Sequence, residues 1–417
     1  MDAFLIEGGR KLEGVVKISG SKNASLPILA ATILTEDDVY LENVPDLSDV
    51  KTMLKLLSNI SKEISYEDGK LLIKQGGEVQ TVAPYDLVKT MRASVLVLGA
   101  LIGKYHSARV SFPGGCAIGA RPIDQHLKGF EAMGVKIDIE EGYIVANVDK
   151  LRGARVVFDL PTVGGTENVM MAAVLAEGET IIENAAMEPE ITDLASFLNS
   201  LGAKIEGAGT PLIRIQGVKK LHGGSYRVIP DRIEAATYFI AGAMSGGEVI
   251  VDDLIPEHID AVLKKVAEAG IDFKVEEKRV VVYGGKRPKP VQVKTRPYPG
   301  FPTDVQAQIM SMLTLARGTS VIVETIFENR FMHVNELNRM GARIKVEDRT
   351  AVVEGVEKLK GAPVMASDLR ASASLVLAGL VAEGVTKISR IYHLDRGYER
   401  MEYKLNALGA HVERIKE

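Results

Sequence analysis

The sequence predicts an α/β protein made of six copies of one βαβαββ unit, three copies in each of two domains. Three recurring features support this fold class: a helix-ending glycine, a β-rich strand upstream of it, and an alanine-rich apolar helix upstream of that strand. The chain has 417 residues. Single hydrophobic cores stop growing at roughly 250–300 residues, so length alone also favours two domains.

The helix-ending glycine follows an amphipathic segment and recurs at nearly constant spacing. It is found at Gly134, Gly202, Gly270, Gly341 and Gly409. Successive spacings are 68, 68, 71 and 68 residues, and a degraded first copy ends at Ile60-Ser61, 73 residues before Gly134. Glycine is favoured just after a helix because it adopts a positive φ without steric cost. The residues after it alternate, as in Lys136–Ile139 and Tyr143–Val145, which predicts a two-stranded hairpin.

A β-rich strand and an apolar helix precede each of these segments. The strands are expected at Asp38–Asn43, Ala108–Phe112, Thr180–Glu183, Glu248–Val251, Ser320–Glu324 and Thr386–Ser389. The helices are expected to begin near Lys22, Arg92, Thr166, Asp231, Thr303 and Leu369. Because these helices are apolar nearly all round, as in Arg370–Val381, we expect them in the interior.

One long doubly wound sheet is the alternative architecture. We disfavour it because no G-x-G-x-x-G follows a strand and because the apolar helices look too buried for it. The predicted domain breaks fall near residues 20 and 230, each after a strand that precedes a buried helix. Residues 20–229 then form one domain, and residues 1–19 plus 230–417 form the other. We expect an active site in the cleft between them.

Composition excludes several functional classes. The net charge is −4 and no basic cluster stands out, which argues against nucleic-acid binding. One cysteine excludes an internal disulfide and suits a reducing compartment. The first residues lack a signal-peptide pattern, and no uninterrupted apolar run reaches about 18 residues. We therefore expect a cytoplasmic protein without membrane insertion.

Basic residues mark the predicted starts of three of the six buried helices, at Lys22, Arg92 and Arg370. A helix N-terminus carries unsatisfied N–H groups and the positive end of the helix dipole. Cations there are unfavourable unless an anion binds or a carboxylate pairs with them. We favour an anionic ligand, and carboxylates at a domain boundary are the alternative.

The only cysteine, Cys116, lies in a loop with three glycines within six residues. With Arg121 five residues further on, this thiol is expected to be exposed and prone to ionise. An inert surface thiol is the alternative. No His, Cys or Asp spacing predicts a metal site, and His126, His333 and His393 are better explained by packing or capping. We expect neither a metal nor a cofactor.

Seven segments together resemble one known family over essentially the whole chain. They are Ser19–Ala24, Tyr85–Ser94, Gly114–Pro122, Phe301–Asp304, Phe327–His333, Asp368–Ala373 and Asp395–Arg400. The family is that of the enolpyruvyl transferases, in particular its UDP-N-acetylglucosamine branch. The resemblance implies two inside-out α/β barrel domains, each with threefold pseudosymmetry.

The resemblance also implies an activity. The enolpyruvyl group of phosphoenolpyruvate would be transferred to the 3′-hydroxyl of UDP-N-acetylglucosamine by addition and elimination, with release of phosphate. This is the first committed step of peptidoglycan synthesis. We expect the chain to act as a monomer on these two substrates.

By resemblance, Cys116 is the general acid, forms a covalent adduct with phosphoenolpyruvate, and is alkylated by the antibiotic fosfomycin. Lys22 is a second candidate for the acid, and Asp304 would take the proton of the sugar hydroxyl. The substrate phosphate would be bound by Lys22, Arg121 and Arg396, and the substrate carboxylate by Arg330, Arg370 and Arg396. The catalytic set is then Cys116, Asp304, Lys22 and Arg396.

The remaining expected substrate contacts are mainly to the nucleotide sugar. They are Asn23, Arg92, Arg121, Pro122, Ile123, Asp124, Gln125, Thr162, Val163, Gly164, Ile326 and Asp368. Two rival functions are weighed against this one. The shikimate-pathway enolpyruvyl transferase would not be expected to carry the Cys116 loop. A non-catalytic nucleotide-sugar sensor would be expected to have lost Lys22, Cys116, Asp304 or Arg396.

Overall fold

The computed structural model describes residues 2–112 and 123–417. The predictions for Cys116, Arg121 and Pro122 therefore lie outside the described residues. The described chain divides into two compact units. The N-unit comprises residues 20–112 and 123–229, and the C-unit comprises residues 2–19 and 230–417. Each unit contains three four-stranded sheets.

The sheet of the third repeat shows the pattern common to all six. Its strands are β10 (Arg155–Val157), β11 (Glu179–Glu183), β13 (Leu212–Gln216) and β12 (Lys204–Glu206), in that order. β10 and β11 are parallel, and the other pairs are antiparallel. Helix α6 (Val163–Ala173) connects β10 to β11, and α7 (Pro189–Ser200) connects β11 to the hairpin. The predicted βαβαββ repeat is confirmed, as six separate sheets and not as one closed barrel among the described strands.

The other N-unit elements follow the same order. In the first repeat they are β14 (Gly224–Arg227), α1 (Lys22–Ala31), η1 (Thr32–Leu34), β3 (Val39–Glu42), α2 (Ser48–Ile60), β4 (Lys62–Glu67) and β5 (Lys70–Gln75). In the second they are β6 (Val82–Ala83), α3 (Tyr85–Val88), η2 (Arg92–Leu96), α4 (Val97–Tyr105), β7 (Ser107–Ser111), α5 (Asp124–Ala132), β8 (Lys136–Glu140) and β9 (Tyr143–Asn147).

The C-unit holds the remaining three repeats. The fourth has β2 (Gly14–Lys17), α8 (Arg232–Ser245), β15 (Glu248–Asp252), η3 (Pro256–Ile259), α9 (Asp260–Glu268), β16 (Asp272–Val275) and β17 (Arg279–Tyr283). The fifth has β18 (Gln292–Lys294), η4 (Thr303–Val305), α10 (Gln306–Leu313), β19 (Thr319–Val323), α11 (His333–Arg339), β20 (Arg343–Glu347) and β21 (Thr350–Glu354). The sixth has β22 (Pro363–Met365), α12 (Leu369–Val381), β23 (Val385–Ser389), η5 (Ile391–Arg396), α13 (Met401–Ala407), β24 (His411–Lys416) and β1 (Asp2–Glu7).

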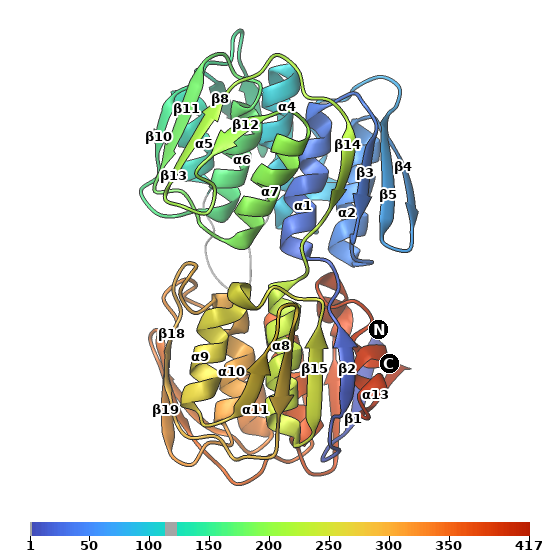
Figure 1. Ribbon diagram of the computed structural model, residues 1–417, viewed down its shortest axis with the longest axis vertical. Coiled ribbons are helices and arrows are strands. Elements are labelled where there is room, and N and C mark those ends of the chain that lie inside the picture. The colour runs from blue at the N-terminus through green and yellow to red at the C-terminus, as the bar shows by residue number, and fades with distance from the viewer. Residues whose placement is uncertain (1, 113–122) are drawn as a thin grey trace. The chain divides into compact units, whose positions relative to one another are not determined.

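Two edge strands are exchanged between the units. β2 precedes α1 in the chain but pairs with β15, where Val16 lies opposite Val251. β14 precedes α8 but pairs with β3, where Tyr226 lies opposite Leu41. In addition, β1 lies between β23 and β24, so the two ends of the chain share one sheet. Figure 1 marks the N- and C-termini close together. Each unit is therefore completed by strands distant in sequence.

Buried helices form the centre of each unit's core, as the sequence predicts. In α12 every residue from Leu369 to Leu380 is buried. Three helix starts differ from the prediction. The helices expected at Arg92 and Thr303 begin as the 3₁₀ turns η2 and η4, and α6 begins at Val163, three residues earlier than expected. Thr162 caps α6 by accepting a hydrogen bond from the Gly165 N–H. Because glycine has a low helix propensity, Gly164 and Gly165 make this helix start difficult to recognise in the sequence.

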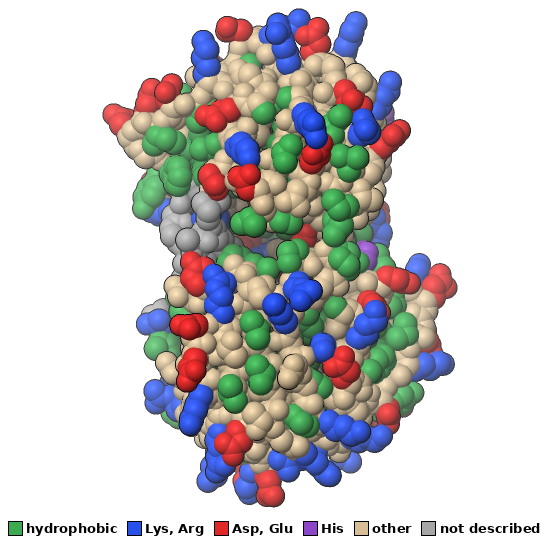
Figure 2. Space-filling view, turned by 90° about the vertical axis from the view of Figure 1, so that its left-hand side faces the viewer, with side chains coloured by type: hydrophobic (Ala, Val, Ile, Leu, Met, Phe, Trp, Pro, Cys, Tyr) green, Lys and Arg blue, Asp and Glu red, His purple; other side chains and the backbone are tan. Residues whose placement is uncertain are grey.

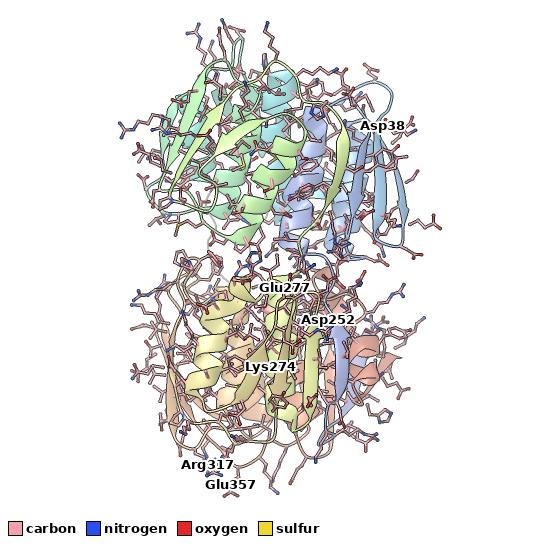
Figure 3. The ribbon with its side chains drawn as sticks, viewed as in Figure 1. Asp38, Asp252, Lys274, Glu277, Arg317 and Glu357 are labelled. Carbon is pink, nitrogen blue, oxygen red and sulfur yellow. The ribbon has the colours of Figure 1, made fainter. Side chains whose placement is uncertain are left out.

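Charged side chains of both signs are mixed over the visible face of the molecule (Figure 2). Many form exposed pairs on the outer sheet faces. Asp252 on β15 accepts a hydrogen bond from Arg279 Nε at 3.1 Å, and Lys274 on β16 pairs with Glu276 at 2.9 Å. Figure 3 labels Asp252 and Lys274. Such pairs contribute about 0–1 kcal/mol each. No helix in the described ranges is long and apolar enough to cross a membrane.

Candidate active site

In the C-unit, Asp304 lies between two buried arginines. Arg330 Nη1 is 2.8 Å from Asp304 Oδ1, and Arg370 Nη2 is 3.2 Å from Asp304 Oδ2. The arginine side chains are only 7% and 4% exposed, whereas Asp304 is 26% exposed. This carboxylate is thus partly open to solvent, and it pairs with two guanidinium groups that solvent barely reaches.

Three elements place these groups. Asp304 lies in the 3₁₀ turn η4, Arg330 in the loop after β19, and Arg370 in the first turn of α12. Asp368 caps α12, because its Oδ1 accepts hydrogen bonds from the backbone N–H groups of Arg370 and Ala371 at 2.9 and 3.0 Å. The cap fixes the helix start from which Arg370 extends. The substrate contact expected of Asp368 stays a prediction.

Arg370 is a buried cation. Its guanidinium carbon lies 5.4 Å from the ring centroid of Tyr398, and its Nη1 is buried without a hydrogen-bond partner among the described residues. Burial opposes the charge of Arg370, but Tyr398, Asp304 and Asp231 outweigh this and raise its pKa. Arg370 is therefore a permanent cation, and a guanidinium group suits binding of a carboxylate or phosphate. Arg396, at the end of η5, is half-buried.

In the N-unit, Lys22 is the first residue of α1 and pairs with Asp49 of α2. Lys22 Nζ is 3.4 Å from Asp49 Oδ2, and both side chains are largely buried. Ser21 caps α1 by accepting a hydrogen bond from the Ala24 N–H at 3.1 Å. Pairing of helix-start cations with carboxylates, the alternative left open by the sequence, is thus present at Lys22 and at Arg370. Asn23 is half-buried beside Lys22.

His126 lies against Gly164, one of the expected substrate contacts in the N-unit. It is buried on α5, its Nδ1 is 2.8 Å from Asn168 Nδ2, and a Cβ on Gly164 would lie 3.0 Å from its Cε1. Burial, reinforced by Arg92, lowers the pKa of His126 to about 4, so the ring is neutral at pH 7. His126 thereby packs beneath the Thr162–Gly164 helix start.

Neighbouring side chains fix the start of α5. Gln125 Nε2 donates to Asp159 Oδ2 at 2.9 Å and to Asp124 Oδ2 at 3.2 Å, and Gln125 Oε1 accepts from the Asp159 N–H at 2.8 Å. Ile123, just before α5, is buried. The contacts of Asp49 and Asp159 were not foreseen, whereas the packing role expected of His126 is confirmed. Only the acidic first turn of α2 hinted at Asp49.

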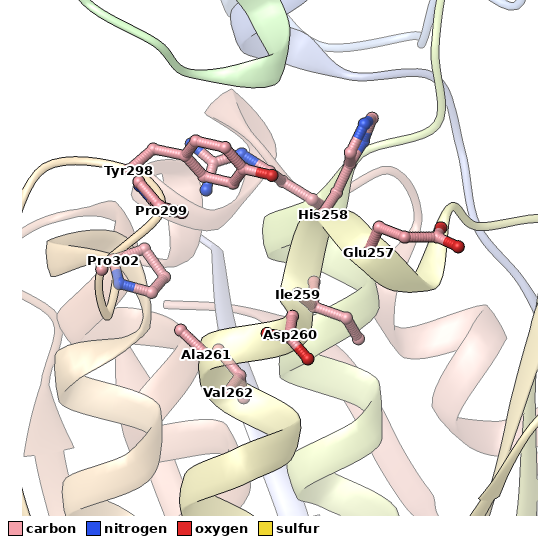
Figure 4. A pocket seen from close by; sticks show the side chains of 11 residues that line it. Glu257, His258, Ile259, Asp260, Ala261, Val262, Tyr298, Pro299 and Pro302 are labelled. Atoms are coloured by element: carbon pink, nitrogen blue, oxygen red, sulfur yellow. The ribbon is translucent and has the colours of Figure 1, made fainter. Parts of the chain in front are cut away.

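A cavity of about 250 Å³ lies elsewhere in the C-unit, at the N-terminal end of α9 (Figure 4). Its lining includes Arg232, His258, Tyr298 and Pro302. None of the expected site residues that the structure describes lines it. Among the residues that the structure describes, no group of three or more His, Cys, Asp and Glu could hold a metal ion.

Comparison with known proteins assigns the family. Residues 6–405 match the family model described as EPSP synthase (3-phosphoshikimate 1-carboxyvinyltransferase). The chain is 56% identical over 418 residues to a UDP-N-acetylglucosamine 1-carboxyvinyltransferase of Desulfovibrio desulfuricans, and 57% identical over 419 residues to one of Trichlorobacter lovleyi. Both matches cover 100% of each protein.

Solved structures share the fold. The enolpyruvyl transferase NikO from Streptomyces tendae aligns with a TM-score of 0.90 at 24% identity, covering 100% of this chain and 99% of that one. An EPSP synthase from Acinetobacter baumannii aligns with a TM-score of 0.78 at 18% identity, covering 100% of both. With the family model and the full-length relatives in agreement, the chain belongs to the enolpyruvyl (1-carboxyvinyl) transferase family.

Proposed function

We propose that this enzyme transfers the enolpyruvyl group of phosphoenolpyruvate to the 3′-hydroxyl of UDP-N-acetylglucosamine, releasing phosphate. The observation that carries the proposal is the identity of 55–57% over 99–100% of the chain to four proteins named UDP-N-acetylglucosamine 1-carboxyvinyltransferase. The reaction would be the first committed step of peptidoglycan synthesis. A monomer in the cytoplasm stays a prediction, as does a cleft between the units as the place of reaction.

The chemistry requires an acid and a base. Protonation of the methylene carbon makes C2 of phosphoenolpyruvate electrophilic, and the sugar oxygen attacks C2 as its proton leaves. The tetrahedral adduct then loses the methyl proton and phosphate, which restores the enol ether. Cys116 or Lys22 is the proposed acid. Asp304 is the proposed base, because it presents a carboxylate to solvent while two arginines hold both of its oxygens.

The anionic groups of the substrate need fixed cations. Arg330 and Arg370 are rigidly held and nearly buried, which favours the planar, bidentate binding of the substrate carboxylate. Lys22, Arg121 and Arg396 are proposed for the phosphate. The nucleotide sugar is assigned to Asn23, Arg92, Arg121–Gln125, Thr162–Gly164 and Ile326.

Phosphate release distinguishes this function from its nearest rival. The enzyme should release phosphate from phosphoenolpyruvate when UDP-N-acetylglucosamine is added, and not when shikimate 3-phosphate is added. The reverse preference would overturn the proposal, and no release with either acceptor would favour a non-catalytic sensor. Cys116→Ser should also abolish covalent labelling by fosfomycin, detected as a mass increase of the intact protein.

A further inference from the structure

A buried carboxylate outside the expected site, Glu324, joins three segments of the C-unit. The residue is 1% exposed and directly follows β19. Its Oε1 accepts hydrogen bonds from Thr295 Oγ1 at 2.8 Å and from the backbone N–H groups of Ile326 and Phe327 at 2.9 and 3.3 Å. Its Oε2 accepts from Thr303 Oγ1 at 3.0 Å and Gln306 Nε2 at 3.3 Å. All five donors are uncharged.

Two of these donors lead directly to the candidate site. The Thr303 hydroxyl donates to Glu324 and accepts a hydrogen bond from Arg330 Nη1 at 2.9 Å. The same Arg330 nitrogen is 2.8 Å from Asp304 Oδ1. The Gln306 amide nitrogen donates both to Glu324 and to the Arg330 carbonyl, the latter at 2.9 Å. Glu324 therefore contacts Thr303 and Gln306, which both hydrogen-bond to Arg330, and is not itself a member of the Asp304–Arg330 pair.

The two acceptors around the Gln306 side chain determine the orientation of its amide group. Its Oε1 is buried and has no hydrogen-bond partner in the described ranges. The reverse amide orientation would place Oε1 against two acceptors, the Glu324 carboxylate and the Arg330 carbonyl. One unsatisfied acceptor is thus tolerated so that the amide nitrogen can join Glu324 to the Arg330 backbone.

Three other repeats show what this position does where its residue is Asn or Asp. The residue after the corresponding strand is Asn43, Asn184 or Asp253 in three of the other repeats, and Phe112 or Arg390 in the remaining two. Asn43 Nδ2 donates to the Val228 carbonyl and Asn184 Nδ2 to the Phe158 carbonyl, each just beyond the parallel edge strand. Asp253 pairs with Lys17 at the end of β2. Each bond joins two strand ends. Glu324 keeps this bond, through Thr295 just beyond β18, and adds four others.

We infer that Glu324 is a positioning residue of the proposed transferase, which holds Asp304, Arg330 and Ile326 in register through Thr303, Gln306 and its own backbone contacts. The inference rests on the proposed function, which assigns those three residues to the site. Glu324 does not touch the substrate. Its effect on the reaction is the alignment of groups that do.

Glu324→Gln tests this with little change in shape. An amide nitrogen at the Oε1 position would face two backbone N–H groups, so the new NH₂ is expected at the Oε2 position. There it opposes the Gln306 amide nitrogen, and the contact between Gln306 and the Arg330 carbonyl is lost. Misplacement of a reacting group by about 1 Å can cost roughly 100-fold in rate, so we expect a loss of kcat of about that size with little change in KM.

The control and the partner variants separate positioning from stability. Asn184→Ala removes the equivalent strand-end bond and should lower stability while kcat stays at the wild-type value. Thr303→Val removes the bridging hydroxyl at constant shape and should lower kcat about as much as Glu324→Gln does. Thr303→Ser keeps the hydroxyl and should retain the wild-type kcat. Because both residues act on Arg330, the double variant Glu324→Gln/Thr303→Val should lose no more kcat than either single variant.

The outcomes are distinct. Wild-type kcat in Glu324→Gln, or losses that multiply in the double variant, would overturn the inference. Loss of kcat in Asn184→Ala equal to that in Glu324→Gln would reduce Glu324 to a structural role. If the wild-type enzyme releases no phosphate, the proposed function fails. The same double-variant comparison in free energy of unfolding then tests the Glu324–Thr303 link alone.

Discussion

Replacing Asp304 by asparagine tests whether one carboxylate holds two buried guanidinium groups. Asp304→Asn removes the negative charge but keeps the shape, so Arg330 and Arg370 remain buried as unpaired cations. Removing one partner of a buried ion pair costs about 3–5 kcal/mol. Since the Asp304 side chain is 26% exposed, solvent screens part of the interaction, and we expect a loss of about 2–3 kcal/mol.

Thermal unfolding followed by circular dichroism measures this loss. One kcal/mol shifts Tm by about 2–4 °C in a domain of roughly 150–250 residues, so Asp304→Asn should lower the C-unit transition by about 4–12 °C. Asp272→Asn is the matched control. It removes a carboxylate of the same unit that pairs with Lys286, with side chains 64% and 60% exposed. Its effect should stay within about 0.5 kcal/mol.

Anions provide a second readout. The unpaired guanidinium groups of Asp304→Asn should bind phosphate or sulfate more tightly than the wild-type site does, so either anion should raise the Tm of the variant more than that of the wild type. A Tm equal to that of the wild type, with no selective anion effect, would refute the reasoning that the Asp304 carboxylate stabilises the two buried guanidinium groups.

Three further predictions concern the folded units. Ser61→Gly should be about 1 kcal/mol more stable than Ser61→Ala in urea unfolding, because both lose the hydroxyl but only glycine relieves the φ of 128°; greater stability of the alanine variant would contradict this. Burial, reinforced by Glu190 and Glu188, raises the pKa of Glu167, so stability should fall as pH rises above 4.5, and Glu167→Gln should remove up to about 1.4 kcal/mol per pH unit of that fall. An unchanged slope would show that Glu167 ionises freely in the fold. The lowered pKa of His126 means that stability is lost as pH falls from 6.5 towards 4, and His126→Gln should abolish about 3 kcal/mol of that loss. If His126→Gln loses as much stability at low pH as the wild type does, another group causes the acid sensitivity.

Local signals in the sequence account for most of the secondary structure. The glycines that end the outer helices, from Gly134 to Gly409, all have positive φ, and Ser61 takes the same backbone region in the degraded copy. The apolar helices are buried as expected. Capping chemistry was harder to recognise, because the glycines after Thr162 resemble a loop more than a helix start.

Non-local pairing could not be predicted in detail. Nothing in the residues of β14 indicates that β3, rather than the strand after α8, is its partner, because pairing between strands distant in sequence leaves no local pattern. The same is true of β1, which lies between β23 and β24. The family resemblance predicts Asp304, Arg330 and Arg370 as site residues, but it does not predict that Asp304 lies between the two arginines.

Supporting polar groups were the least visible part of the candidate site. Glu324 was assigned to the end of a strand, and its five hydrogen bonds come from segments separated by up to 32 residues, from Thr295 to Phe327. Side-chain networks of this kind depend on tertiary contacts that leave no periodic pattern in the sequence. The difference between Glu324 and its repeat equivalents Asn43 and Asn184 was the only available signal.

The identity of the acceptor is the most direct test of the account. The enzyme is incubated with phosphoenolpyruvate and equal amounts of UDP-N-acetylglucosamine and shikimate 3-phosphate, and mass spectrometry identifies which acceptor gains the enolpyruvyl group. We predict that UDP-N-acetylglucosamine alone is converted, with one phosphate released for each product formed. Conversion of shikimate 3-phosphate instead, or of neither acceptor, would contradict the account.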